Sequence, residues 1–124
     1  MMTLTKVRRV LIVDDVADLR MLLRMTLSGN EEFEVVAEAS DGLEAIAQAE
    51  RHQPDLVVLD LSMPVLDGLE ALPRILEVAP DARVVVLSGF DESRMREPAL
   101  AAGAVAYLQK GDIFAVAEAL KLVA

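Results

Sequence analysis

The fold is decided by residues 56–64, which read Leu56-Val57-Val58-Leu59-Asp60-Leu61-Ser62-Met63-Pro64. The first four residues are aliphatic, which is typical of a short strand that is buried on both faces, and an aspartate follows at once. In open parallel α/β sheets, ligands bind beyond the carboxyl ends of the strands. Asp60 therefore lies where functional residues gather, and we expect the residues that follow the other strands to lie at the same edge of the sheet.

Four further segments have the composition of strands, namely residues 10–13, 33–39, 84–87 and 105–108. Between the strands, apolar residues recur every three or four positions, as they do on one face of a helix. An alternating order of strands and helices requires crossover connections, which cover both faces of a parallel sheet. We therefore expect an α/β domain with a doubly wound, five-stranded parallel sheet.

Helix starts agree with this division of the chain. Asp41 and Glu44 have the spacing of a capping box, and Asp67 and Glu70 have the same spacing. Asp112 is expected to start the last helix. These positions predict helices that begin directly after the second and third strands and after the fifth.

Two prolines fall inside helical patterns. Pro73 lies in the third helical segment and Pro98 in the fourth, which we place at residues 91–102. Because proline lacks a backbone donor and disfavours helix at the preceding residue, we expect a kink or a late helix start at each. The fourth segment should also have low local stability.

The composition is that of one acidic domain. The chain has 124 residues, a formal net charge of -9 and no cysteine, and we expect a single domain over residues 1–124. This negative charge repels the phosphate backbone and argues against direct nucleic-acid binding. The lack of cysteine suits a reducing compartment, and no apolar run reaches the roughly 20 residues of a membrane span. We therefore expect a cytoplasmic protein without membrane contact.

The residues that follow the strands carry the chemistry. Asp14 and Asp15 follow the first strand, Asp60 the third, Ser88 the fourth and Lys110 the fifth. Carboxylates about 4 Å apart repel one another by about 4 kcal/mol per pair at an effective dielectric of 20, so such a cluster needs a cation. Oxygen ligands without histidine or cysteine favour Mg²⁺. A lysine and a hydroxyl beside a metal suit a phosphoryl group.

Simpler interpretations exist for each residue taken alone. An acidic pair after a strand often only caps the next helix. Ser88 alone would be a turn residue, and Tyr107 alone a half-buried aromatic of the sheet. Asp60 and Lys110 at the same edge favour a functional site over helix capping at Asp14 and Asp15.

The ordered set of residues resembles the receiver domain of bacterial two-component response regulators, in the CheY-like superfamily. The resemblance covers almost the whole chain, and it is carried by Asp14-Asp15, Leu59-Asp60-Leu61-Ser62-Met63-Pro64, Asp67-Gly68, Ser88-Gly89, Tyr107 and Lys110. It implies a three-layer α/β/α fold of the flavodoxin/CheY type with strand order 2-1-3-4-5.

The resemblance also implies roles at the site. Asp60 would be the phosphoacceptor, while Ser88 and Lys110 would contact the phosphoryl oxygens. The domain would not be a conventional enzyme but would catalyse its own phosphorylation and dephosphorylation. The metal would be Mg²⁺, held by Asp14, Asp15, Asp60 and the backbone carbonyl of Ser62.

The resemblance also implies how the phosphorylation signal reaches a partner. The ring of Tyr107 would turn inward as Ser88 moves toward the phosphoryl group, changing the surface of the fourth helix, fifth strand and fifth helix. Expected partners are a sensor histidine kinase or phosphotransfer protein, and an output domain or downstream protein. A homodimer could form through that surface or through the first and fifth helices.

Three other functions fit parts of this pattern. A haloacid-dehalogenase-like phosphatase would need a second acid two residues after Asp60, where Ser62 stands. A flavodoxin-like electron carrier would need a phosphate-binding loop where Asp14 and Asp15 place negative charge. A degenerate receiver that works without phosphorylation stays a minor alternative.

Overall fold

A five-stranded parallel sheet forms the middle layer of the protein in the computed structural model, which describes residues 6–89 and 92–123. The strand order is β2-β1-β3-β4-β5, which confirms the expected fold and order. Every expected strand is present within two residues of its predicted bounds. The strands are β1 (Arg8–Val13), β2 (Phe33–Ala39), β3 (Leu56–Leu59), β4 (Arg83–Ser88) and β5 (Ala106–Gln109).

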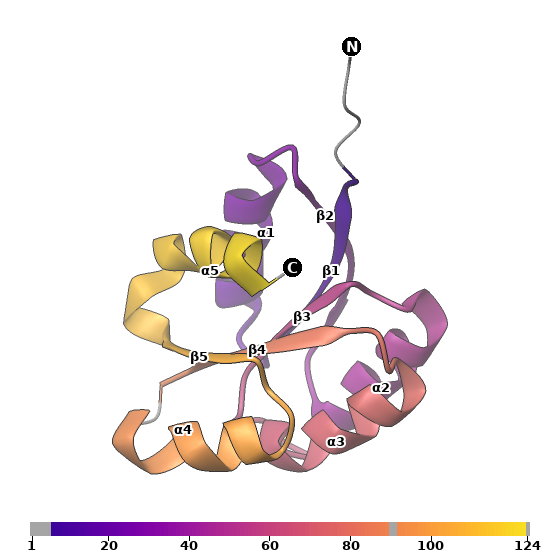
Figure 1. Cartoon of the computed structure of the whole chain (residues 1–124), viewed down its shortest axis with the longest axis vertical. Helices are drawn as coiled ribbons and strands as arrows, with labels where there is room; N and C mark the ends of the chain where they lie inside the picture. The colour runs from indigo at the N-terminus through magenta and orange to yellow at the C-terminus, as the bar shows by residue number, and fades with distance from the viewer. Residues whose placement is uncertain (1–5, 90–91, 124) are drawn as a thin grey trace.

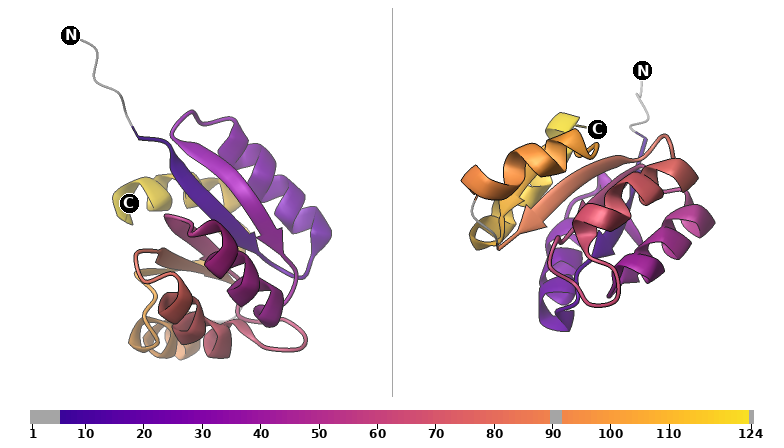
Figure 2. Two further views of the ribbon diagram at one scale, coloured as in Figure 1. Left: turned by 90° about the vertical axis from the view of Figure 1, so that its right-hand side faces the viewer. Right: turned by 90° about the horizontal axis from the view of Figure 1, so that it is seen from below.

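Helices cover both faces of this sheet. In Figures 1 and 2, α1 and α5 lie on one side, and α2, α3 and α4 lie on the other. A 3₁₀ helix, η1, connects β5 to α5. The helices are α1 (Ala17–Ser28), α2 (Gly42–His52), α3 (Gly68–Val78), α4 (Glu92–Ala101), η1 (Lys110–Ala115) and α5 (Val116–Val123). No helix in the described ranges has the length and apolar character needed to cross a membrane.

The core consists of two clusters, one on each face of the sheet, because successive side chains of a strand point to opposite faces. In β1, Val10 and Ile12 join the cluster beneath α1 and α5, whereas Leu11 and Val13 join the cluster beneath α2, α3 and α4. All four residues of β3 are buried. The sheet edge where β1 and β3 end is therefore held rigidly from both sides.

Two predicted helix caps are confirmed. The Asp41 side chain accepts a hydrogen bond from the Glu44 amide at 2.8 Å, and Asp67 accepts one from the Glu70 amide at 2.8 Å. The expected start of the last helix at Asp112 is wrong, because η1 begins at Lys110 and α5 only at Val116. Ile113 and Val116 are both buried, and the three-residue spacing of a 3₁₀ turn brings both to the core.

Of the kink or late helix start expected at each proline, the late start is wrong at both. Helix α3 begins five residues before Pro73, and α4 begins at Glu92, before Pro98. In α3, buried packing of Ala71, Leu72 and Ile75 compensates for the hydrogen bond that proline cannot donate. Residue 91 of the expected segment 91–102 lies outside the described residues.

Candidate functional site

The site begins with backbone pairing that continues one residue beyond two strands. The amide of Asp60 donates to the carbonyl oxygen of Val13 at 2.9 Å, and that of Asp14 donates to Ala39 at 3.0 Å. Asp14 and Asp60 are each 1% exposed, whereas Asp15 is exposed. The sheet therefore fixes two buried carboxylates side by side at its carboxyl edge.

Helix capping does not explain the acidic pair. The N-cap of α1 is Val16, which makes no side-chain capping bond. Asp14 Oδ1 instead accepts from the amide of Val16, at 2.9 Å. That bond orients the Asp14 side chain at the end of β1, and the capping interpretation is wrong.

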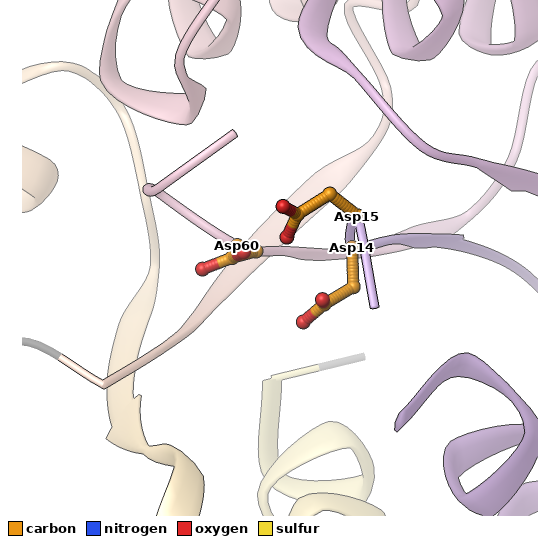
Figure 3. A group of neighbouring side chains, drawn as sticks. All are labelled: Asp14, Asp15 and Asp60. Carbon is orange, nitrogen blue, oxygen red and sulfur yellow. The ribbon is translucent and has the colours of Figure 1, made fainter. Parts of the chain in front are cut away.

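Three carboxylates and one ammonium meet at this edge. Oxygens of Asp14, Asp15 and Asp60 lie within 4.8 Å of one another (Figure 3). Lys110, just after β5, brings its Nζ to 2.9 Å from Asp14 Oδ2 and 3.2 Å from Asp60 Oδ2. The structure thus brings together the four charged residues that the sequence predicted at one edge.

Asp60 keeps one oxygen available. Its Oδ1 accepts from the Ser62 amide at 3.2 Å. Its Oδ2 is buried and has no hydrogen-bond partner among the described residues, so its contact with Lys110 is ionic. A pocket of about 220 Å³ is lined by Asp60, Ser62, Gly89 and Lys110. It has room for a phosphoryl group and several waters, at about 30 Å³ per water.

Burial makes the ionised carboxylate unfavourable. Desolvation and the negative charge of Asp14 raise the pKa of Asp60 from 3.8 to about 6, although Lys110 and the Ser62 amide oppose the rise. Desolvation would lower the pKa of Lys110, but its hydrogen bond to Asp14 and the charge of Asp60 outweigh burial and raise this pKa. One ammonium therefore only partly neutralises the carboxylates.

The residues fit a divalent cation. The donors are all carboxylate oxygens, which suits a hard ion, and Asp60 Oδ2 is a buried acceptor without a hydrogen bond. Asp15 adds an exposed carboxylate, so an ion could enter the cluster from solvent on this side. The acidic cluster could hold a metal ion.

A tight loop after β3 completes the site, and the sequence did not reveal its contacts. Val65 has a φ of 70°, and the Leu66 amide donates to the Pro64 carbonyl at 2.8 Å, which closes a three-residue turn. A Cβ on Gly68 would lie 2.0 Å from the carbonyl oxygen of Asp60, so only glycine permits this approach. The Asp67-Gly68 pair was the only sequence signal for it.

Ser88 and Tyr107 lie on the two strands beyond β3. Ser88 is completely buried at the end of β4, where it is paired with Gln109. Tyr107 is 3% exposed and belongs to the cluster beneath α4, so the half-buried alternative is wrong. The ring already lies inside the protein in this structure.

Comparison with known proteins agrees with this arrangement. Residues 10–121 match the family model of the response regulator receiver domain. The chain belongs to the response regulator receiver family. Receiver domains are signalling switches of two-component systems and not conventional enzymes, which excludes the phosphatase and electron-carrier alternatives.

Relatives of this receiver domain include proteins of similar length and longer proteins. It is 41% identical over 102 residues to the chemotaxis protein CheY of Bacillus subtilis, which covers 82% of this chain and 84% of that protein. It is 47% identical over 105 residues to the transcriptional regulatory protein PdtaR of Mycobacterium tuberculosis, covering 83% of this chain and 49% of that protein. The receiver domain thus spans about half the length of that regulator.

A solved structure resembles it closely. The CheX-CheY-BeF3-Mg+2 complex from Borrelia burgdorferi contains a chain with a TM-score of 0.87 and 31% identity. The match covers 94% of the receiver domain and 85% of that chain. The fold is thus shared over nearly the whole sequence.

Proposed function

We propose that this receiver domain is a phosphorylation switch in which Asp60 accepts one phosphoryl group from a histidine kinase or phosphotransfer protein. The observation that supports this most is the buried Oδ2 of Asp60, which has no hydrogen bond among the described residues and belongs to a side chain that lines the pocket with Lys110. This oxygen would attack the phosphorus in line. The new oxygen–phosphorus bond forms as the bond from phosphorus to the donor's imidazole nitrogen breaks.

The other charged groups would hold the reactants. Asp14, Asp15, Asp60 and the Ser62 carbonyl would bind Mg²⁺, which neutralises charge on the transferred phosphoryl group. The Lys110 ammonium and the Ser88 hydroxyl would contact the phosphoryl oxygens. Lys110 is suited to this because it already contacts two carboxylates, and its raised pKa keeps it protonated. The domain would thereby catalyse its own phosphorylation and dephosphorylation.

A solved structure that contains a related chain supports both Mg²⁺ and a phosphoryl group as ligands of this site. The solved complex from Borrelia burgdorferi that contains the similar chain includes CheX, CheY, beryllofluoride and Mg²⁺. Beryllofluoride stands for a phosphoryl group on a carboxylate. The acidic cluster and pocket of this chain have the charges that such ligands require.

Tyr107 would transmit the phosphorylation signal from the site to the protein surface. We propose that movement of Ser88 toward the phosphoryl group favours the inward position of the Tyr107 ring, which is also its position in this structure. The surface of α4, β5 and α5 would then bind an output domain, a downstream protein or a second copy, with α1 and α5 as the alternative dimer surface. We also propose that residues 1–124 form one receiver domain and that this domain works in the cytoplasm.

Intact-mass spectrometry tests the phosphoacceptor. With Mg²⁺ and acetyl phosphate, the protein should gain the mass of one phosphoryl group, and Asp60→Asn should abolish the gain. Asp41→Asn is the matched control, since asparagine also caps helices and the change removes one carboxylate outside the cluster. Undiminished modification of Asp60→Asn would remove Asp60 from its role.

A further inference from the structure

Arg20 reaches the site from helix α1, although it is not one of its ligands. Its Nη1 donates to the main-chain oxygen of Asp14 at 2.5 Å, and its side chain is only 20% exposed. That oxygen belongs to the peptide bond joining Asp14 to Asp15. Arg20 therefore fixes the plane of the peptide that carries both aspartates at the end of β1.

Glu38 on the edge strand β2 keeps the guanidinium in place. Arg20 Nε donates to Glu38 Oε1 at 3.2 Å. The second oxygen of Glu38 accepts from Arg24 Nη1 at 2.6 Å. Arg24 lies one helical turn further along α1 and is 52% exposed. It forms the same kind of ion pair with Glu38 as Arg20 does, but it does not contact Asp14.

We propose that Arg20 is a positioning residue for the cation site, since it directs the carboxylate of Asp15 toward Asp14 and Asp60. Because Asp15 is exposed, packing does not confine its side chain, and the direction of its backbone decides where its carboxylate lies. The inference rests on the proposed function, because it requires these carboxylates to bind a divalent cation.

The sign of the effect separates positioning from simple electrostatics. Arg20→Gln removes a positive charge that contacts the main-chain oxygen of Asp14, so electrostatics alone would tighten Mg²⁺ binding. Loss of positioning would weaken it, by about 10-fold or more, as is usual when a group that orients a metal ligand is removed. The two explanations therefore predict opposite changes in affinity.

Magnesium titrations of the ¹⁵N-labelled protein, followed by amide chemical shifts, test the proposal. We expect Arg20→Gln to bind Mg²⁺ about 10-fold more weakly. Arg24→Gln, the matched control, should bind as the wild type does or slightly more tightly. Arg20→Lys keeps the charge and one donor, so it should recover part of the affinity. Without metal, the Asp15 amide shift should change in Arg20→Gln and stay unchanged in Arg24→Gln.

Each result has a defined meaning. Equal or tighter Mg²⁺ binding by Arg20→Gln would overturn the positioning role, and so would equal weakening by Arg24→Gln. If Arg20→Gln does not fold, as urea unfolding in EDTA would show, Arg20→Lys decides, and wild-type affinity in that variant would overturn the positioning role. A wild type without saturable Mg²⁺ binding would instead contradict the proposed function itself.

Discussion

Replacing Asp60 with asparagine should make the metal-free protein more stable, even though it removes the proposed phosphoacceptor. Burial and Asp14 raise the pKa of Asp60 from 3.8 to about 6, so the ionised carboxylate destabilises the folded state. These two pKa values differ by about two units. At about 1.4 kcal/mol per unit, the difference corresponds to about 3 kcal/mol of folding free energy. Asparagine is neutral and has nearly the same shape, and its oxygen can still accept from the Ser62 amide.

The pH dependence has a definite sign. The folded state binds a proton more tightly than the unfolded chain, so stability is greatest below pH 3.8 as far as this group is concerned. It declines as pH rises from about 4 to about 6, and the full destabilisation is present at pH 7.5. Asp60→Asn should therefore differ most from the wild type above pH 6 and little below pH 4.

Urea unfolding followed by circular dichroism measures this effect. In EDTA at pH 7.5, we expect Asp60→Asn to raise the free energy of unfolding by about 2–3 kcal/mol, or the Tm by about 10 °C. Mg²⁺ should stabilise the wild type more than the variant, because a ligand stabilises the state that binds it. Asp81→Asn removes one exposed carboxylate before β4, at the opposite edge of the sheet, and should change stability by less than about 0.5 kcal/mol.

A variant that is equal to or less stable than the wild type in EDTA would refute this reasoning. That result would mean that the ionic contact with Lys110 at 3.2 Å stabilises the carboxylate more than burial and Asp14 destabilise it. The same stability difference at pH 4 and pH 7.5 would show that the effect does not come from ionisation of Asp60.

Three further predictions concern the same edge of the sheet. Asp15→Asn should weaken Mg²⁺ binding in calorimetric titrations, and unchanged affinity would remove Asp15 from the metal site. Gly68→Ala should lower the free energy of unfolding by at least about 2 kcal/mol, because the new Cβ would lie 2.0 Å from the Asp60 carbonyl oxygen. Gly111→Ala is the control and should change stability little, because a Cβ at that position would have no atom within 4 Å. Beryllofluoride with Mg²⁺ should alter amide hydrogen exchange in α4 and β5, and changes confined to the loop after β3 would contradict the proposed output surface.

The sheet and most of the site could be predicted because they depend on simple patterns. Strand β3 is aliphatic at every position and buried at every position, so its bounds are unambiguous. Parallel strands bring their carboxyl ends to one edge, so Asp14, Asp60 and Lys110 had to approach one another once the strands were known. The residue types then indicated the charge of the ligand.

The remaining features depend on backbone geometry that residue types do not encode. Arg20 contacts a main-chain oxygen, and every residue has one, so no spacing rule indicates that contact. Val65 adopts a φ of 70°, which a β-branched residue rarely does, because the loop is closed between the Pro64 carbonyl and the Leu66 amide. The 3₁₀ turn after Lys110 likewise follows from the need to bury Ile113 and Val116.

The charge imbalance that destabilises the empty site is also what we expect to drive its response. Asp14, Asp15 and Asp60 carry three negative charges against the single positive charge of Lys110, so a divalent cation would neutralise the cluster. Phosphorylation of Asp60 replaces one negative charge by about two, which restores the excess in a pocket that is already desolvated. A hydroxyl and an ammonium lie on the β4 and β5 side of the site, because Ser88 ends β4 and Lys110 follows β5. We therefore expect the new charge to be compensated from the side of the sheet that carries Tyr107 and α4. A coupling of about 1–3 kcal/mol would shift the populations of two surface arrangements roughly 5- to 150-fold.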